Sequence, residues 1–422
     1  MKVLIITYYW PPAGGSGVQR WLKFVKYLQN YGITPVVFTP ANAKYPITDA
    51  SLLKELPKNI TVLQLPITNP QDYVSFFTPK HKKTKQAGVA NLSKGGFLSW
   101  VRGNFFIPDA KKYWIKPAVK YLTNYIENNT IDAIISTGPP HSMHLIAQQL
   151  KRNLGLKWIA DFRDPWTSLY YNEDFNLSSF AKKKNKALEK SVLKEADTVI
   201  TVSKQLQKEL EEIAQKVALI PNGYDDEVLI NEALSLDSKF SLAHIGLLPT
   251  QSNPQILWEV LKSIAEENKD FEKDLEIRLT GNVNPTTLQD LTRYQLITKT
   301  KLQTSVPHQE AIRQQKKAQV LLLLIPNTKK SAGILTGKLF EYITSKRPIL
   351  GIGAKQGDAA AILKETQTGV LVAFDDREGL TKEIKRLYKK YKTNQLKVTP
   401  QNIAQYHRKA LTAELSVLLK TK

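Results

Sequence analysis

Short runs of β-branched and other apolar residues alternate along the chain with longer stretches in which apolar residues recur every three or four positions. A short run bounded by turn residues predicts a buried strand, and the longer periodicity predicts an amphipathic helix. Strands separated by segments of helix length pair in parallel, because the chain must cross over the sheet between them. The pattern therefore predicts an α/β fold built on parallel sheets.

The alternation occurs in two series. The first predicts strands at Val3–Thr7, Thr34–Thr39, Ala133–Ser136, Trp158–Asp161, Thr198–Val202 and Val217–Ile220, and helices at Val18–Tyr31, His144–Leu154, Lys186–Glu195 and Lys204–Ile213. The second predicts strands at Ser241–Ile245, Glu276–Thr280, near Leu302, and at Gln319–Ile325, Ile349–Ile352 and Gly369–Ala373, and helices at Gln255–Glu267, Thr286–Tyr294, His308–Lys316, Leu335–Ser345 and Ala359–Thr366. Each series predicts a doubly wound, Rossmann-like sheet.

The length of 422 residues also favours two domains, because single cores stop growing near roughly 250 to 300 residues. We place the first domain at 1–222, an acidic, turn-rich connection at 223–240 and the second domain at 241–400. The remaining residues, 401–422, contain a helix expected at Gln401–Leu419 that could pack back on the first domain.

Composition excludes several classes of site and location. With no cysteine, the chain has no disulfide, thiolate nucleophile or zinc–thiolate site. The apolar start ends at Thr7 and is followed by Pro11-Pro12, which fits a buried strand better than a signal peptide. No apolar run approaches the roughly 18 to 20 residues of a membrane span, so we expect a cytoplasmic protein.

The net charge of +22 is concentrated in the first half, most densely in residues 80–120, where Asp109 is the only acidic residue. Aromatic residues such as Trp100, Phe105 and Trp114 are interleaved with these lysines and arginines. Basic and aromatic side chains together suit the surface of an anionic membrane. No nucleic-acid-binding motif accompanies the charge, so we expect peripheral contact with the inner face of the cytoplasmic membrane, with a solvated loop as the alternative.

Candidate residues follow several strands of the first series. Gly14, Gly15 and Gly17 follow the first strand, where free backbone N–H groups could approach a ligand, although a tight structural turn fits their spacing equally well. Asp161, Arg163 and Asp164 follow a later strand, at the edge where open α/β sheets bind ligands, and a salt-bridged structural corner is the alternative.

Two histidines, His141 and His144, follow the Ala133–Ser136 strand and could meet on one face of a helix. An imidazole can exchange protons near neutral pH, so His144 is a catalytic candidate beside the alternatives of capping and packing. The sequence nearby supplies no third ligand at a recognisable spacing, and we expect no metal.

The segment Ser331–Tyr342 offers the most chemistry in the second series. Small residues precede a predicted helix whose first turns carry Lys338, and Glu341 follows three positions later on nearly the same face. A helix start and a cation could hold a diphosphate while the carboxylate accepts hydrogen bonds from ribose hydroxyls. A Lys/Glu pair on a solvated helix is the alternative.

In the order of these motifs, the chain resembles the family-four glycosyltransferases with the two-lobed GT-B fold, in particular bacterial cell-envelope members. The resemblance spans nearly the whole chain and rests on the glycine turn, Asp161–Trp166, Ser203-Lys204, Ile220–Gly223, His244–Gly246, Leu279–Gly281, Val306–Ala311 and Lys338–Tyr342. It implies two Rossmann-like domains facing a cleft, with the acceptor on the first and the nucleotide sugar on the second.

The resemblance also implies a set of functional residues. For nucleotide-sugar binding these are Gly14, Gly15, Gly17, Gly246, Gly281, Val306, Gly333, Ile334, Leu335, Lys338 and Glu341, and for catalysis Asp161, Arg163 and Asp164. His144 remains a catalytic candidate through its imidazole chemistry. Three positions depart from the family pattern: Gly333 replaces the first of two glutamates, no base follows Gly246, and Arg163 stands where a histidine is common. Lys338 would then supply most of the charge that stabilises the diphosphate.

The implied activity is that of a retaining glycosyltransferase acting by front-side attack, with a nucleotide-diphosphate sugar as donor and a cell-envelope glycan or lipid-linked acceptor. It needs no cofactor beyond the donor. Fold alone does not separate this activity from that of a nucleotide-sugar epimerase or an inverting transferase. The departures at Gly333 and after Gly246 leave an inactive, sugar-nucleotide-binding homologue as a further alternative.

Overall fold

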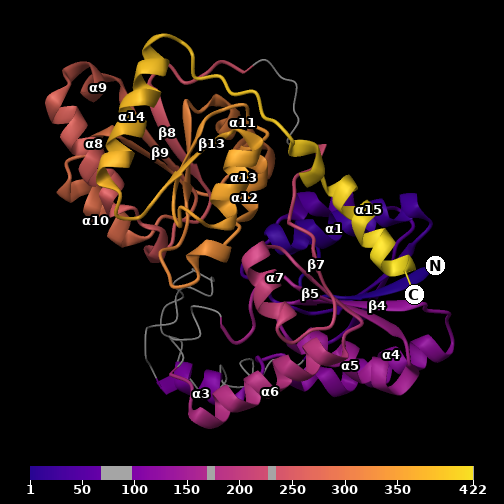
Figure 1. The fold of residues 1–422 in the computed structure, drawn as a ribbon. Helices are drawn as coiled ribbons and strands as arrows, with labels where there is room; N and C mark the ends of the chain where they lie inside the picture. Colours follow the sequence, from indigo (N-terminus) through magenta and orange to yellow (C-terminus); the bar gives the residue numbers. More distant parts are fainter. Residues whose placement is uncertain (68–96, 169–175, 227–233, 422) are drawn as a thin grey trace. The chain divides into compact units, whose positions relative to one another are not determined.

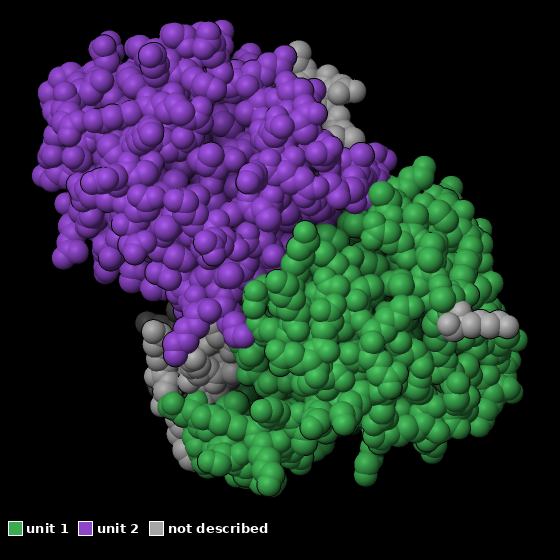
Figure 2. Space-filling model, in the orientation of Figure 1, with its two compact units in different colours: residues 1–222, 408–422 green, residues 223–407 purple. Residues whose placement is uncertain are grey.

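The computed structural model describes residues 1–67, 97–168, 176–226 and 234–421. The chain forms two compact units, coloured separately in Figure 2: unit 1 comprises 1–222 and 408–422, and unit 2 comprises 223–407. Residues 80–96 of the predicted membrane-contact segment lie outside the described part. Among the described helices, none combines the length and apolar character that a membrane crossing requires.

In its described part, unit 1 is built on a seven-stranded sheet in the order β3-β2-β1-β4-β5-β6-β7, and every pairing is parallel. Its strands are β1 (Lys2–Ile6), β2 (Thr34–Pro40), β3 (Thr61–Leu65), β4 (Ala133–Gly138), β5 (Lys157–Phe162), β6 (Thr198–Thr201) and β7 (Val217–Leu219). The strand order reverses between β1 and β4, which is where open α/β sheets form a crevice for ligands.

Helices cover both faces of this sheet, as Figure 1 shows. They are α1 (Ser16–Leu28), α3 (Phe97–Phe105), α4 (Ile115–Glu127), α5 (Ser142–Leu154), α6 (Ser179–Glu195), α7 (Lys204–Glu211) and α15 (Arg408–Lys420). Alternate residues of β1 point to opposite faces: Val3 and Ile5 pack with α1 and α15, whereas Leu4 and Ile6 pack with α4 and α5. Strands buried on both faces explain the continuous apolar runs of the sequence.

The described part of unit 2 contains a six-stranded parallel sheet in the order β10-β9-β8-β11-β12-β13. Its strands are β8 (Phe240–Ile245), β9 (Leu275–Thr280), β10 (Thr300–Gln303), β11 (Val320–Leu324), β12 (Ile349–Ile352) and β13 (Gly369–Val372). The reversal of strand order falls between β8 and β11. The carboxyl ends of these two strands therefore mark the expected ligand edge of unit 2.

The helices of unit 2 form two layers (Figure 1). They are α8 (Gln255–Glu267), α9 (Lys269–Asp274), α10 (Pro285–Arg293), α11 (His308–Lys317), α12 (Gly337–Tyr342), α13 (Asp358–Thr366) and α14 (Arg377–Lys392). One apolar cluster joins the sheet to α8, α9, α10 and α14, and a second joins its other face to α11, α12 and α13. Two separate cores therefore sandwich the sheet.

The predicted fold class, two doubly wound α/β domains, is confirmed. The sequence analysis did not identify β3, α3, α4, α9 or α14, although Leu380, Ile384 and Leu387 in α14 have helical spacing and are buried. The C-terminal region also differs in detail, because a short 3₁₀ turn (Ile403–Tyr406) precedes α15 and the long helix begins only at Arg408.

Candidate functional site

The carboxyl ends of β1, β4 and β5 bring together the candidates of unit 1, and Asp161 lies deepest among them. Its fully buried carboxylate pairs with Arg20 at 3.1 Å and accepts hydrogen bonds from Trp21 Nε1 at 2.7 Å and Thr137 Oγ1 at 2.8 Å. A carboxylate enclosed by these donors cannot reach a substrate hydroxyl. The geometry is that of the salt-bridged corner, and it removes Asp161 from the catalytic candidates.

Arg20, the partner of Asp161, was not among the predicted site residues. It also donates to the carbonyl oxygens of Ile220 at 2.8 Å and Pro221 at 2.7 Å, so one guanidinium ties α1 to β5 and to the segment that follows β7. Burial lowers the pKa of Arg20, and the adjacent Asp161 opposes that effect. Arg20 stands three residues after Gly17, and this position was the signal in the sequence that could have indicated a role at the site.

Arg163 connects the glycine turn to the β4 segment. Its guanidinium donates to the carbonyl oxygens of Gly138 at 3.1 Å and Pro139 at 2.7 Å. A Cβ on Gly17 would lie 1.7 Å from Arg163 Nη1, so Gly17 leaves room for this side chain. Gly15 has a φ of 106°, which glycine adopts most readily. The glycine turn therefore leaves room for the Arg163 side chain, and its backbone at Gly15 is exposed.

His144 is buried and makes contacts typical of packing. Its Nδ1 lies 2.8 Å from Ser136 Oγ, and its ring stacks on Phe162 with centroids 4.6 Å apart. His141 stacks similarly on Trp166. Burial lowers the pKa of His144 to about 3 and that of His141 well below its ordinary value, so both rings are neutral. The structure favours packing over proton transfer for His144, because its ring is closed off from solvent.

Asp164 is the remaining carboxylate candidate of this edge. It is half-buried, and among the described residues no hydrogen-bond donor reaches its carboxylate. Burial raises the pKa of Asp164, and the neighbouring Arg163 partly offsets the rise. Of the predicted acidic residues in unit 1, it is therefore the one able to accept a hydrogen bond from a ligand.

In unit 2, two glycines shape the ends of β8 and β9. Gly246 and Gly281 have φ values of 124° and 118°, a region that favours glycine. A Cβ on Gly281 would lie 2.5 Å from the Gly246 carbonyl oxygen, and one on Gly246 would lie 3.1 Å from Lys338 Nζ. The absence of both side chains lets the two turns and Lys338 approach closely.

Lys338 and Glu341 of α12 have different partners. The Lys338 ammonium contacts His244 Nε2 at 3.1 Å and donates to the Leu247 carbonyl oxygen at 3.3 Å. Glu341 accepts hydrogen bonds from His308 Nε2 at 2.9 Å and Gln315 Nε2 at 2.8 Å, both from α11. These partners differ from the alternative of a Lys/Glu pair on a solvated helix. His244, His308 and Gln315 were not predicted as site residues.

The remaining donor-side candidates surround α12 and α11. Gly333 ends a 3₁₀ turn (Ser331–Gly333), and Ile334 and Leu335 continue to α12 as half-buried residues. Val306 is half-buried and lies two residues before α11. The predicted helix Leu335–Ser345 is shorter in the structure, since α12 has only six residues. Lys338 places a full positive charge in the first turn of this short helix.

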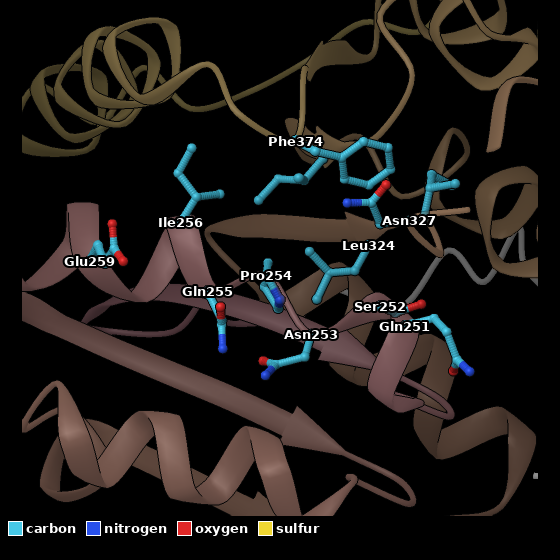
Figure 3. A pocket seen from close by; sticks show the side chains of 12 residues that line it. Gln251, Ser252, Asn253, Pro254, Gln255, Ile256, Glu259, Leu324, Asn327 and Phe374 are labelled. Atoms are coloured by element: carbon cyan, nitrogen blue, oxygen red, sulfur yellow. The ribbon is translucent and has the colours of Figure 1, made fainter. Parts of the chain in front are cut away.

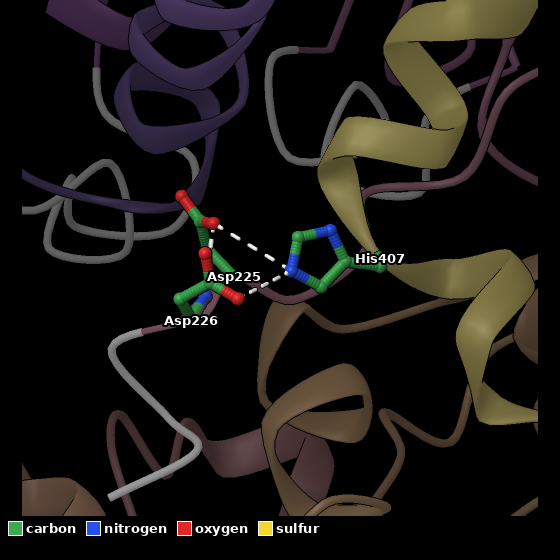
Figure 4. A group of neighbouring side chains, drawn as sticks. All are labelled: Asp225, Asp226 and His407. Atoms are coloured by element: carbon green, nitrogen blue, oxygen red, sulfur yellow. Dashed lines mark hydrogen bonds and ion pairs between the residues drawn. The ribbon is translucent and has the colours of Figure 1, made fainter.

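A carboxylate–imidazole group stands where the chain enters and leaves unit 2 (Figure 4). His407 Nε2 lies 2.9 Å from an oxygen of Asp226 and 3.9 Å from one of buried Asp225. The Tyr224 N–H also donates to the Tyr406 carbonyl oxygen at 3.0 Å. In the described residues this is the group whose spacing could admit a metal ion. The same contacts also serve a structural role, because they join the segment at Tyr224–Asp226 to the segment at Tyr406-His407.

The model for Glycosyltransferase Family 4 matches residues 15–228, a span that includes Gly15 and Gly17 of the glycine turn, Arg20 and the Asp161–Trp166 segment. The chain belongs to Glycosyltransferase Family 4. The enzyme class predicted from the sequence is that of this family. No protein with a curated function matches the chain.

Solved structures with similar folds match this Family 4 protein over nearly its whole length. A glycosyltransferase from Rickettsia africae has 12% identity and a TM-score of 0.65, covering 99% of this chain and 97% of its own. WaaG, a glycosyltransferase involved in lipopolysaccharide biosynthesis, has 11% identity and a TM-score of 0.59 with full coverage of both chains. A candidate UDP-N-acetylglucosamine 2-epimerase from Listeria monocytogenes has 13% identity and a TM-score of 0.56, with 100% and 97% coverage. These likenesses establish the GT-B fold.

Proposed function

We propose that this protein is a retaining glycosyltransferase that moves a sugar from a nucleoside diphosphate to a cell-envelope glycan or lipid-linked acceptor. The arrangement of Lys338 beside Gly246, with Glu341 one helical turn away, supports the donor side of the proposal. The Lys338 cation can neutralise a diphosphate that approaches the backbone at Gly246. Glu341, already a hydrogen-bond acceptor, can exchange its protein donors for ribose hydroxyls.

The chemistry that fits these residues is front-side displacement. The bond between the sugar C1 and the diphosphate oxygen breaks, and the acceptor oxygen bonds to C1 on the same face. The acceptor proton passes to an oxygen of the departing diphosphate, whose charge Lys338 stabilises. This scheme relies on positioning and electrostatics, and it needs neither a metal nor a protein nucleophile. Asp164 would orient the acceptor hydroxyl.

The membrane part of the proposal rests on the described portion of the basic segment and on α6. Asn104 in α3 accepts a hydrogen bond from the Ser178 N–H at the start of α6, which brings the two helices together. Phe105 is 60% exposed and Phe180 in α6 is 70% exposed. Lysines occupy positions 182–184, one residue after Phe180. Exposed rings beside cations are suited to an anionic lipid surface, where a lipid-linked acceptor would be presented.

The decisive test is transfer of radiolabelled sugar from a panel of nucleotide sugars to membrane-extracted acceptors. We expect acceptor-dependent product, and Lys338→Ala and Glu341→Ala should each lower its formation at least about 100-fold while the protein stays folded. Lys364→Ala, an exposed lysine on α13, is the matched control. Isomerisation of the sugar nucleotide without acceptor would instead establish an epimerase. Unchanged transfer in both variants would refute the donor-site assignment.

Product stereochemistry tests the retaining mechanism separately. Proton NMR of the initial product should show the anomeric configuration of the donor. Inversion would refute front-side displacement while leaving the transferase assignment intact. For the membrane contact, flotation with anionic vesicles should decrease when Phe105 and Phe180 are replaced by serine. Equal flotation of the variant would refute this surface.

A further inference from the structure

A hollow of about 350 Å³ lies at the carboxyl ends of β11 and β12, on the face of the unit 2 sheet that packs against α8. It is lined by Gln251, Ser252, Asn253, Pro254, Gln255, Ile256, Glu259, Leu324, Ile325, Asn327, Ile352 and Phe374. Figure 3 shows these side chains arranged around it. Neither Lys338 nor Glu341 is part of this lining, so the hollow is distinct from the group proposed to bind the donor diphosphate.

A hydrogen-bond network fixes one wall of the hollow. Asp290 accepts hydrogen bonds from the side-chain amides of Asn253 at 2.5 Å and Gln255 at 3.2 Å. The Asn253 oxygen in turn accepts a hydrogen bond from Trp258 Nε1 at 2.9 Å, and Trp258 is fully buried. The turn that leads into α8 is thereby held in one conformation. A preformed wall lowers the entropy cost of binding a ligand.

A second set of contacts holds Glu259 of α8 and the segments that follow β8 and β11. Glu259 accepts hydrogen bonds from the Tyr294 hydroxyl at 2.8 Å and from Arg377 Nη1 at 3.0 Å. The Asn327 N–H donates to the Gln251 carbonyl oxygen at 2.8 Å, which joins the segment after β11 to the segment after β8. Glu259, the one carboxylate of the lining, is thus already paired with the Arg377 cation.

Three polar side chains of the lining are uncommitted. Among the described residues, the amides of Gln251 and Asn327 and the Ser252 hydroxyl make no side-chain hydrogen bond. Figure 3 shows Asn327 and Phe374 among the side chains that line the hollow. The hollow thus combines neutral donors and acceptors with an aromatic ring and an apolar floor that includes Leu324 and Ile352.

This composition selects a class of ligand. The lining has no lysine or arginine, so a phosphate would lose its hydration without gaining a counter-charge. Neutral amides and a hydroxyl match vicinal hydroxyl groups, which both donate and accept hydrogen bonds. The apolar C–H face of a pyranose fits against an aromatic ring. The size also lies near the lower end for ligand pockets, which suits one or two sugar rings.

We propose that this hollow is a binding site for an uncharged pyranose residue, separate from the diphosphate-binding group. The proposal rests on the proposed function, because the substrates of a glycosyltransferase are the source of the sugar. Two sources supply the same chemistry: a pyranose of the acceptor glycan, and the sugar of the donor. The segment from Gly246 to Asn253 borders Lys338 at one end and the hollow at the other.

Saturation-transfer NMR on the full-length protein tests binding without turnover. The probes are glucose, galactose, mannose and N-acetylglucosamine, with uridine and inorganic phosphate as comparators. We expect at least one sugar to bind and its affinity to fall about tenfold in Asn327→Ala and in Phe374→Ala, the scale of one lost contact. Gln289→Ala, an exposed amide on α10, is the matched control and should bind as the parent does.

Three binding results would overturn the proposal, and transfer kinetics distinguish the two sources of the sugar. Failure of all four sugars to bind, displacement of the sugar by uridine, or unchanged affinity in both variants would overturn the proposal. In transfer assays, a raised KM for the acceptor in Asn327→Ala assigns the site to the acceptor glycan, and a raised KM for the donor assigns it to the donor sugar. Because sugar binding is measured without catalysis, it can fail or succeed independently of the Lys338→Ala test of the proposed function.

Discussion

Lys338 Nζ lies 3.1 Å from Nε2 of His244, a buried residue on β8. An ammonium can only donate, so in this contact Nε2 is the acceptor. Nδ1 lies 3.2 Å from the Leu322 carbonyl oxygen, and Nε2 lies 3.2 Å from the Leu247 carbonyl oxygen, to which Lys338 also donates. Burial lowers the pKa of His244 to about 3, and the Lys338 charge contributes in the same direction. A neutral imidazole therefore holds the cation beside the Gly246 turn.

Donor binding should depend on pH through Lys338. Burial lowers the pKa of Lys338 from 10.5 to about 8, with Glu341 opposing the shift, so the free protein loses this positive charge as pH rises through about 8. We expect kcat/KM for the donor to fall above that pH. Lys338→Arg should retain its charge and keep kcat/KM level up to about pH 10. An identical alkaline fall in the variant would assign the titration to another group.

His244 should act as a positioning residue for Lys338. His244→Leu removes the acceptor, and we expect about a tenfold rise in donor KM, a smaller change in kcat and an alkaline fall that begins at lower pH. His244→Gln provides an amide oxygen and should recover part of the affinity. Kinetics across pH measure both effects. If the leucine variant loses stability but keeps the parent pH profile, His244 has only a packing role.

Asp161 should be required for folding rather than for chemistry. Asp161→Ala leaves the fully buried Arg20 without its counter-charge, and breaking such a pair costs about 3–5 kcal/mol of unfolding free energy. Urea denaturation measures the loss. Asp164→Ala is the comparison, because we expect it to retain stability and lose transfer activity. A stable, inactive Asp161→Ala protein would restore Asp161 as a catalytic candidate.

Acid should destabilise unit 1 through His141 and His144. Both pKa values are lower in the folded protein than the unfolded value of 6.5, so the unfolded chain binds more protons below that pH. Each ring then lowers the unfolding free energy by the increment that belongs to the uptake of one proton, and for His144 this continues down to about pH 3. His144→Gln should reduce the slope of stability against pH by one such increment. Parallel slopes would contradict neutral burial of His144.

The sequence by itself determined the fold class and pointed to Lys338 and Glu341, the residues proposed to bind the donor. Apolar runs and period-3.6 patterns are local, and a strand such as Val320–Leu324, which is buried on both faces, is recognised by the short length of its apolar run. Edge strand β3 was missed because its residues are half-buried or exposed and carry a weaker pattern. Lys338 and Glu341 could be recognised because both stand in one short segment.

Tertiary structure alone decided what each polar residue does. Asp161 and Asp164 are three positions apart in one segment, yet one is enclosed by Arg20, Trp21 and Thr137 and the other has no described donor. Likewise, His244 and Lys338 are 94 positions apart and meet only when β8 and α12 pack together. Burial and partners set a side chain's charge and reach, and both depend on contacts that the local sequence does not contain.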